Sequence, residues 1–227
     1  MIDALTWTKT HQKEIVNKIV SDANLESSEK PVAIFMAGLP GAGKTELTYG
    51  IMEQFGRSFI RIDMDELATM IKGYKPEIAD EFRRPATRLL DNLFSKTIKE
   101  KLDFIMDGTF GSSKATQNIE RVVKRGYNVN VVYVYQDPKR AWEFTLAREK
   151  IEHRSISKEG FLESYYKTIN NLHKAAMQFD GRITIHIMEK DKNNKVKGQW
   201  VDVSEDRIDK IINIIYNKDE LRKYIES

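Results

Sequence analysis

Residues 31–55 read PVAIFMAGLPGAGKTELTYGIMEQF, and three patterns follow one another in this segment. Residues 31–38 form a continuous apolar run that ends in glycine, which is typical of a strand buried on both faces of a parallel sheet. Residues 44–55 predict a helix. Between them, GLPGAGKT (residues 38–45) is a full match to the pattern G-x-x-x-x-G-K-[ST]. The segment therefore predicts a strand, a phosphate-binding loop and a helix in direct succession.

Each fixed position of this loop has a physical role toward a triphosphate. Glycines at positions 38, 41 and 43 let the backbone turn its N–H groups inward around phosphate oxygens. Lys44 supplies a point charge to the β- and γ-phosphates, the Thr45 hydroxyl suits Mg²⁺, and the start of the helix directs its positive dipole end at the anion. The residues predicted to bind the nucleotide are consecutive: Gly38, Leu39, Pro40, Gly41, Ala42, Gly43, Lys44, Thr45 and Glu46.

The composition excludes several other kinds of site. The 227-residue chain has no cysteine, which excludes disulfides, thiolate catalysis and Cys-ligated zinc. A formal net charge of +3 is too weak to indicate nucleic acid on its own. The first residues, MIDALTWTKTHQKEIVNKIV, do not resemble a signal peptide, and no stretch predicts a membrane span. We expect a cytoplasmic protein, or an effector exported by a route that leaves no such signal.

Strands and helices alternate along the rest of the chain. After the first strand, further strands are predicted at residues 58–63, 103–107, 128–135 and 182–188. Helices are predicted at residues 8–20, from 66 onward, and at 78–101, 114–125, 137–152, 158–178 and 206–225. We expect Pro85 to kink or break its helix, and QWVDV (residues 199–203) to form an edge hairpin.

This alternation predicts the fold class and the domain organisation. It is typical of an α/β three-layer sandwich with a mainly parallel sheet, which with the phosphate loop is the P-loop NTPase/kinase fold. Residues 1–30 would form an N-terminal helix and linker, and residues 31–227 the P-loop kinase domain.

Acidic residues at the strand ends are candidates for chemistry, because ligands of parallel α/β sheets bind beyond the carboxyl ends of the strands. Asp63 and Asp65 follow the second predicted strand, and Asp107 ends the third. A kinase needs one carboxylate for the attacking hydroxyl and another near the hydrated Mg²⁺. Asp107, expected beside the phosphate loop, fits the metal with Thr45, and Asp65 could face the acceptor. The alternative is that Asp63 or Asp65 caps the next helix and that Asp107 belongs to a turn.

Arg148 and Arg154 lie in WEFTLAREKIEHRSISKEGF (residues 142–161), after the fourth predicted strand. Arginines at such a place can stabilise the charge that spreads over a transferred phosphoryl group. The surrounding lysines leave a solvated basic face as the alternative. FRRP (residues 82–85) has the same two interpretations, an acceptor pocket or a solvated helix face.

In combination, these motifs resemble the zeta toxin family. GLPGAGKT, the I-D-x-D motif at residues 62–65, M-D-G-T at residues 106–109 and the pair Arg148 and Arg154 occur in the family's order, and the resemblance covers roughly residues 32–188. The family consists of bacterial P-loop kinases related to small-molecule phosphotransferases. The resemblance implies ATP- and Mg²⁺-dependent phosphorylation of a hydroxyl on a sugar nucleotide such as UDP-N-acetylglucosamine.

The resemblance also implies roles for individual residues. Asp65 would be the base, and Arg148 and Arg154 would contact the ATP phosphates, so the predicted catalytic set is Asp65, Lys44, Arg148 and Arg154. The predicted metal ligands are Thr45 and Asp107. The chain departs from the family at Leu39, where Gln is frequent, and at Asp107, where Glu is frequent.

Two alternatives stay open for the activity, and one question for the partner. A kinase of nucleic-acid 5′-hydroxyls needs the same loop and base but a basic acceptor channel. A nucleotide-dependent ATPase or switch needs no acceptor. Because zeta-like kinases often pair with an antitoxin that blocks the ATP site, an antitoxin is a possible partner. The N-terminal helix at residues 8–20 would then either mimic such a helix or be an ordinary appendage.

Overall fold

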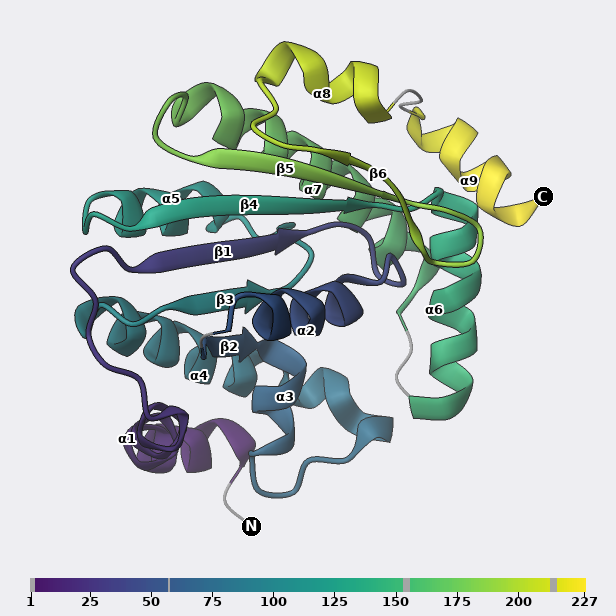
Figure 1. Ribbon diagram of the computed structural model, residues 1–227. Helices are drawn as coiled ribbons and strands as arrows, with labels where there is room; N and C mark the ends of the chain where they lie inside the picture. Colours follow the sequence, from purple (N-terminus) through teal and green to yellow (C-terminus); the bar gives the residue numbers. More distant parts are fainter. Residues whose placement is uncertain (1–2, 57, 153–155, 213–215) are drawn as a thin grey trace.

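The computed structural model describes residues 3–56, 58–152, 156–212 and 216–227 (Figure 1). Its strands are β1 (Val32–Ala37), β2 (Ile60–Asp63), β3 (Phe104–Asp107), β4 (Asn128–Tyr135), β5 (Thr184–Lys190) and β6 (Val196–Trp200). Its α-helices are α1 (Ala4–Ala23), α2 (Lys44–Gln54), α3 (Met64–Thr69), α4 (Ala79–Lys99), α5 (Ala115–Val123), α6 (Pro138–Glu152), α7 (Lys158–Gln178), α8 (Glu205–Ile212) and α9 (Lys218–Glu226), and a short 3-10 helix spans Pro76–Ile78.

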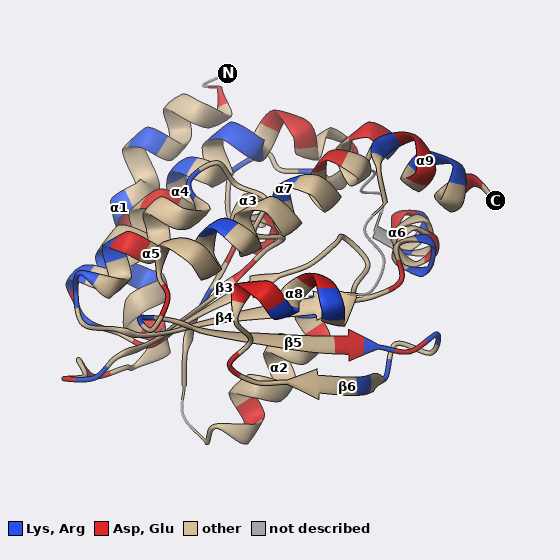
Figure 2. Ribbon diagram, turned by 90° about the horizontal axis from the view of Figure 1, so that it is seen from above, with Lys and Arg blue, Asp and Glu red and all other residues tan. Residues whose placement is uncertain are grey.

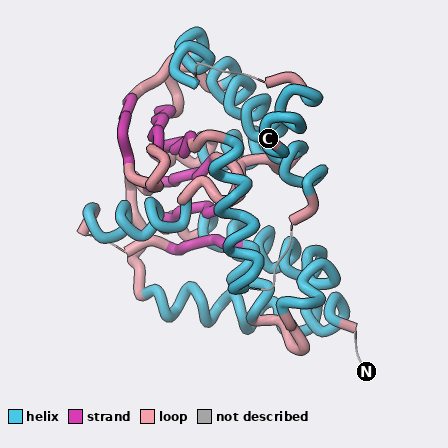
Figure 3. Tube along the Cα trace, turned by 90° about the vertical axis from the view of Figure 1, so that its right-hand side faces the viewer, coloured by secondary structure: helices cyan, strands magenta, loops and turns pink. Residues whose placement is uncertain are grey.

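The described strands form one six-stranded sheet in the order β2-β3-β1-β4-β5-β6. β1 to β5 pair in parallel, and β6 pairs antiparallel with β5. Helix α2 covers one face of the sheet and α4, α5 and α7 lie behind the other (Figure 1), so that helices flank the strands on both sides when the molecule is turned (Figure 3). The predicted three-layer α/β sandwich with a mainly parallel sheet is confirmed.

β1 is buried on both faces, as its unbroken apolar sequence predicts. Ala33, Phe35 and Ala37 belong to a core shared with α3, α4, α5 and α7, whereas Val32, Ile34 and Met36 face the core on which α2 packs. Because successive side chains of a strand alternate between faces, six consecutive apolar residues are needed to fill both cores. This double burial fixes the position of the loop that follows β1.

The sheet brings the predicted acidic residues to one edge. β3 lies directly beside β1 and β2 beside β3, with Asp63 paired in register with Asp107. Asp103 helps to set the start of this register, since its buried Oδ1 accepts a hydrogen bond of 2.6 Å from the Val32 backbone N–H. The expected neighbourhood of Asp107 and the phosphate loop is therefore present.

Four predicted elements differ from the structure. The predicted helix at residues 206–225 is wrong, because the chain forms α8 and then α9, and Asn217 begins α9 with a capping box to Glu220. Pro85 does not break α4, which continues through it. β6 spans Val196–Trp200 and not residues 199–203, and α1 is longer than residues 8–20 because Asp3 caps its first turn.

Helix α1 packs against α4, where Gln12 accepts hydrogen bonds from Arg88 and Asn92. No residue of the described α1 lines the cleft discussed below, so in this structure α1 does not occupy that cleft. Acidic and basic residues are interspersed along α4, α5 and α9 (Figure 2). Among the described helices, none is both long and apolar enough to cross a membrane.

Candidate active site at the carboxyl edge of the sheet

A cleft of about 1350 Å³ lies at the carboxyl ends of the parallel strands. The phosphate loop forms its floor, and residues after β2, after β3, on α6, on α7 and in the turn between β5 and β6 form its walls. Among the predicted nucleotide-binding residues, those that line it are Pro40, Gly41, Gly43, Lys44, Thr45 and Glu46. The Leu39 and Ala42 side chains are instead buried in the core, so these two residues can offer a ligand only their backbone.

Two positions of the loop require glycine, because their φ angles are positive and because other atoms lie too close for a side chain. Gly38 and Gly41 have φ values of 140° and 75°. A Cβ atom on Gly38 would lie 2.5 Å from the Val134 carbonyl oxygen, and one on Gly41 would lie 2.1 Å from the Ala141 carbonyl oxygen. The loop is thus pressed against β4 and the first turn of α6, which holds its N–H groups in place.

Lys44 points back into its own loop. Its Nζ donates hydrogen bonds to the carbonyl oxygens of Gly38 (3.1 Å) and Leu39 (2.6 Å). Desolvation of the ammonium group lowers the pKa of Lys44 to about 8, and the charge of Arg148 acts in the same direction, while Asp107, Glu46 and Asp63 oppose it. An anion in the loop would raise this pKa again, because it stabilises the charged form.

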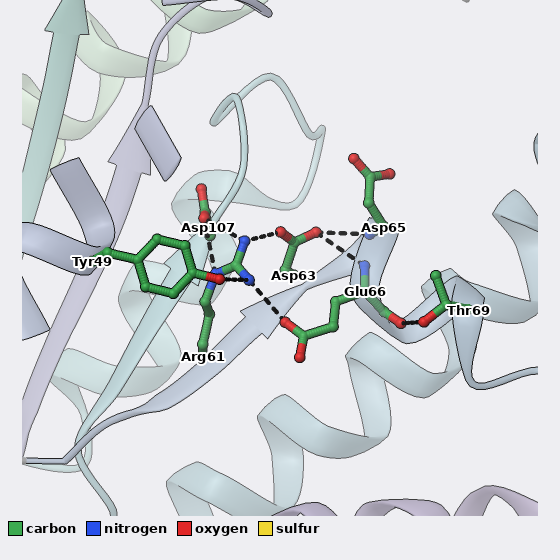
Figure 4. A network of polar contacts seen from close by, with 7 residues as sticks. All are labelled: Tyr49, Arg61, Asp63, Asp65, Glu66, Thr69 and Asp107. Atoms are coloured by element: carbon green, nitrogen blue, oxygen red, sulfur yellow. Dashed lines mark hydrogen bonds and ion pairs between the residues drawn. The ribbon is translucent and has the colours of Figure 1, made fainter. Parts of the chain in front are cut away.

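A partly buried arginine, Arg61, joins the acids at the ends of β2 and β3 (Figure 4). Arg61 donates to Asp107 Oδ2 from both Nε (3.1 Å) and Nη2 (2.9 Å). The same Nη2 donates to Asp63, while Nη1 donates to Glu66 (2.9 Å) and to the Tyr49 hydroxyl (3.2 Å). One guanidinium therefore holds three carboxylates from β2, α3 and β3 in fixed positions.

Asp63 both accepts from Arg61 and caps helix α3. Its Oδ1 accepts hydrogen bonds from the backbone N–H groups of Asp65 (2.7 Å) and Glu66 (3.4 Å) and thereby caps α3, which confirms that interpretation of Asp63. Burial raises the pKa of the Asp63 carboxyl, with Asp65 and Asp107 adding to the effect and Arg61 opposing it. Asp63 thus orients the first turn of α3.

That first turn presents Asp65 to the cleft. Asp65 lines the cleft from the beginning of α3, and its carboxylate is directed away from Arg61 (Figure 4). Because Asp63 accepts from the Asp65 N–H, the backbone of Asp65 is fixed while its side chain faces the interior of the cleft. Asp65 and Asp63 therefore have different surroundings although they are two residues apart.

Thr45 and Asp107 suit a magnesium ion by their chemistry. Both line the cleft, and both offer hard oxygen donors. Arg61 uses only Oδ2 of Asp107 for its bonds, so Oδ1 is the atom that could meet the ion or its water. Among the described residues, no group of three or more His, Cys, Asp or Glu side chains is placed to hold a metal. Mg²⁺ is usually bound in proteins through one or two carboxylates, substrate phosphates and water.

Of the two predicted arginines, Arg148 and Arg154, only Arg148 lies among the described residues. Arg148 lines the cleft from α6, and its charge acts on Lys44, so it lies within electrostatic range of the phosphate loop. Arg154 lies outside the described residues. From the FRRP segment, Arg83 lines the cleft, whereas Arg84 is exposed and Phe82 and Pro85 are buried. The segment therefore supplies one residue to the cleft.

The model of the zeta toxin family matches residues 16–199. The chain belongs to the zeta toxin family. This confirms the resemblance that the order of the motifs indicates, and it extends the matched region beyond residues 32–188 at both ends.

One curated relative and two solved structures are similar to this chain. Toxin PezT of Streptococcus pneumoniae is 24% identical over 132 residues, which cover 54% of this chain and 52% of PezT, so the alignment spans about half of that relative. A chain from the PezAT chromosomal toxin–antitoxin system of the same organism superimposes with a TM-score of 0.73 at 16% identity, covering 98% of this chain and 96% of that one. The AvrRxo1-ORF1:AvrRxo1-ORF2 complex with sulphate ions gives 0.66 at 11% identity, covering 85% and 66%.

The sequence motifs do not indicate Arg61, although it holds the carboxylates of this site together. Its sequence signal is a charged residue between Ile60 and Ile62, two positions before Asp63 on a short strand. Residues two apart on a strand share a face, so Arg61 had to lie beside Asp63. Its bonds to Asp107 depend on the β2–β3 register, which no local pattern reveals.

Proposed function

We propose that this chain is an ATP- and Mg²⁺-dependent kinase that transfers the γ-phosphate to a hydroxyl of a small molecule, a sugar nucleotide such as UDP-N-acetylglucosamine. One observation carries the proposal: Lys44, Thr45, Asp65 and Asp107 line the same cleft. A phosphate-binding loop alone indicates only nucleotide binding. Transfer to a hydroxyl acceptor also needs a base, and a carboxylate that faces the same cleft can supply it.

The size of the cleft supports two substrates. Pockets for a single drug-sized ligand have volumes of about 300–1,000 Å³, and this cleft exceeds that range at about 1350 Å³. The phosphate loop occupies the middle of it, since β1 lies between β3 and β4. A donor nucleotide and an acceptor can therefore meet at the loop from opposite ends.

The residues of this chain would divide the transfer step among them. The acceptor oxygen forms a bond to the γ-phosphorus, the bond to the β–γ bridging oxygen breaks, and the acceptor proton passes to a carboxylate oxygen of Asp65. Lys44 would donate to β- and γ-phosphate oxygens once it exchanges its loop carbonyls for them, and Arg148 would add positive charge. Mg²⁺, held by Thr45 and through Asp107, would supply charge neutralisation on the phosphates.

Several residues that line the cleft have groups that suit a sugar nucleotide. They are Tyr74, Arg83, Lys167 and Ser164, and the buried Oγ of Ser164 has no hydrogen-bond partner in the described part of the chain. Arg83 is paired with Asp80 (2.8 Å) and Lys167 with Glu163 (2.6 Å), both at the surface. Exposed pairs of this kind are weak and exchange readily for a diphosphate.

A protein partner belongs to the same proposal. Because the similar PezAT structure is that of a toxin–antitoxin system, we extend to this chain an antitoxin that covers the nucleotide cleft. Its expected effect is inhibition of transfer by competition with ATP.

A labelled-phosphate screen tests the proposed function. Wild-type protein and Lys44→Ala are incubated with γ-labelled ATP, Mg²⁺ and sugar nucleotides, nucleosides or 5′-hydroxyl oligonucleotides. We expect label on a sugar nucleotide with the wild type and none with Lys44→Ala. Label on oligonucleotides alone would indicate a nucleic-acid kinase, and ATP hydrolysis without any labelled acceptor would indicate an ATPase or switch.

A further inference from the structure

The first turn of α3, which carries Asp65, receives only part of its support from apolar packing. β2 is the edge strand of the described sheet, and α3 follows it directly. In the second half of α3, Leu67 and Ala68 are buried in the core, whereas Met64 in the first turn is only partly buried. Polar contacts must therefore determine much of the position of this first turn.

Arg61 holds this turn by two routes (Figure 4). Its Nη2 donates to Oδ2 of Asp63, whose other oxygen accepts from the backbone N–H groups of Asp65 and Glu66. Its Nη1 donates directly to the Glu66 side chain at 2.9 Å. The residues on both sides of Asp65 are thereby bound to one guanidinium, while the Asp65 carboxylate is directed away from it.

The other bonds of this guanidinium lead to the phosphate loop. Nε and Nη2 donate to Asp107 Oδ2 at the end of β3, which lies directly beside β1. Two residues after Asp107, the Thr109 carbonyl oxygen accepts from the N–H of Gly38, the first glycine of the loop, at 3.3 Å. Nη1 also donates at 3.2 Å to the hydroxyl of Tyr49 on α2, the helix that begins in the loop. The guanidinium therefore connects the first turn of α3 to two segments that adjoin the phosphate loop.

The surroundings of the guanidinium make these bonds effective. The side chains of Arg61, Asp63 and Asp107 are largely buried, whereas that of Glu66 is about half exposed. Charge-assisted hydrogen bonds are short and directional, and buried ones are little screened by salt. Because a guanidinium is planar and its N–H groups form a rigid fork, it holds the carboxylates around it at fixed angles. Movement of the turn away from the phosphate loop would break several of these bonds together.

We propose that Arg61 is a positioning residue that sets the place of Asp65 relative to the phosphate loop. The inference rests on the proposed function, in which Asp65 takes up the acceptor proton and the loop holds the nucleotide. Arg61 itself does not line the cleft, so it acts through the first turn of α3 and not by contact with a substrate. Its effect on transfer is large because displacing a reacting group by about 1 Å can lower the rate by about 10²-fold.

Arg61→Lys tests this role because it keeps the positive charge but replaces the fork by one ammonium group, which cannot reach carboxylates on β2, α3 and β3 together. We expect kcat to fall by about 10²-fold, with the KM for ATP within about threefold of the wild type. In an Asp65→Asn background, the same change should lower the residual rate by less than about threefold, since the displaced group no longer acts. An unchanged kcat for Arg61→Lys, or the full loss in both backgrounds, would overturn the inference.

Arg121→Lys is the matched control. Arg121 is also a partly buried arginine that joins two elements, since it lies on α5 and donates to Ser95 Oγ on α4 at 2.9 Å, but it does not line the cleft. Its substitution should leave kcat within about twofold of the wild type. A decrease as large as that of Arg61→Lys would mean that loosening the fold anywhere slows transfer, which would overturn the inference.

Glu66→Gln gives the same test if Arg61→Lys does not fold, because it removes one of the two routes at a half-exposed position. We expect kcat to fall by about fivefold when Asp65 is present and to stay the same in the Asp65→Asn background. Equal effects in the two backgrounds would contradict a role through Asp65.

Hydrogen exchange measures the position of the turn without nucleotide or acceptor. In peptides that cover residues 63–69, the backbone N–H groups of Asp65 and Glu66 should exchange about tenfold faster in Arg61→Lys or Glu66→Gln than in the wild type, while peptides of α7 stay within about twofold. Equal exchange at residues 63–69 would overturn the inference. A wild-type protein that transfers phosphate to no acceptor, although its α3 turn is protected and the variants lose that protection, would instead refute the proposed function.

Discussion

Arg61 donates two hydrogen bonds to a single oxygen of Asp107, from Nε at 3.1 Å and from Nη2 at 2.9 Å. The Asp107 side chain is only 4% exposed and that of Arg61 15%, so the pair is largely removed from water. Asp63, in register with Asp107 on the neighbouring strand, shares the same guanidinium. Arg61 thus holds two carboxylates side by side at the edge where a triphosphate would bind.

Replacing Arg61 should destabilise the fold strongly. Arg61→Met would leave Asp63 and Asp107 buried without their cation, and loss of one partner of a buried ion pair costs about 3–5 kcal/mol. We expect a decrease of about 3 kcal/mol in the free energy of unfolding in urea. Arg83→Met is the control, because its pair with Asp80 is exposed and should be worth less than about 1 kcal/mol. Equal losses in the two variants would show that the Arg61 network is not a buried ion-pair cluster.

Asp65→Asn should separate catalysis from nucleotide binding. The amide keeps the size of the carboxylate and its place in the first turn of α3 but cannot take up the proton of the acceptor hydroxyl, and loss of a general base lowers kcat by about 10²- to 10⁴-fold. The affinity for ATP should stay within about threefold, because Asp65 does not belong to the phosphate loop.

Asp80→Asn provides the comparison for Asp65→Asn. Asp80 also lines the cleft from the first turn of a helix, but it is exposed and paired with Arg83. We expect its substitution to change kcat by less than about fivefold. If steady-state kinetics showed the same kcat for Asp65→Asn as for the wild type, Asp65 would not be the base.

Two glycines near the loop should respond oppositely to alanine. Gly41→Ala would place a Cβ 2.1 Å from the Ala141 carbonyl oxygen at φ 75°, so we expect a loss of about 2 kcal/mol and weaker nucleotide binding. Gly50→Ala, inside α2 with no atom within 4 Å of the added group, should stabilise by about 0.5–1 kcal/mol. Thermal unfolding of both variants checks this, and a Gly41→Ala protein as stable as the wild type would contradict the close packing of the loop on α6.

His186 should make stability depend on pH. It is half-buried on β5, where its Nε2 lies 3.0 Å from Asn130 Oδ1, and burial lowers its pKa from the ordinary 6.5, opposed by Asp202. As the pH falls below about 6.5, the unfolded chain takes up a proton that the folded chain does not. The free energy of unfolding should therefore decrease until the pH reaches the folded-state pKa.

His186→Gln should reduce this decrease between pH 7 and pH 5.5. Urea unfolding of the two proteins over this range measures the difference, in which the contributions of all other groups cancel. Parallel curves for wild type and variant would mean that His186 titrates alike in the folded and unfolded chain.

Most of the fold can be predicted from the sequence because its signals lie within single segments. The acids are found by a simple rule, since the carboxyl ends of parallel strands meet at one edge of the sheet. The apolar run before the phosphate loop, the alternation of strands and helices and the acids at the strand ends lead to the sheet and to the neighbourhood of Asp107. The single helix at residues 206–225 is wrong because the apolar pattern continues through residues 211–215, although Asn217 and Glu220 together form a readable capping signal.

What the sequence does not reveal depends on contacts between distant residues. The bonds of Arg61 to Asp107 require the register of β2 on β3, and the contact of Asn194 with Gly43 requires a hairpin to curve over a loop 151 residues away. Asparagine in a polar turn between two strands is also a common turn residue. Nothing local to Asn194 indicates that its side chain lies against the phosphate loop.

The most direct test of the central claim is mass spectrometry of UDP-N-acetylglucosamine incubated with ATP, Mg²⁺ and the protein. The account predicts an acceptor that carries one added phosphate with the wild type, and none with Asp65→Asn or Lys44→Ala. An acceptor of unchanged mass, with no phosphorylated product from any other hydroxyl compound while ATP is consumed, would contradict a kinase site in this cleft.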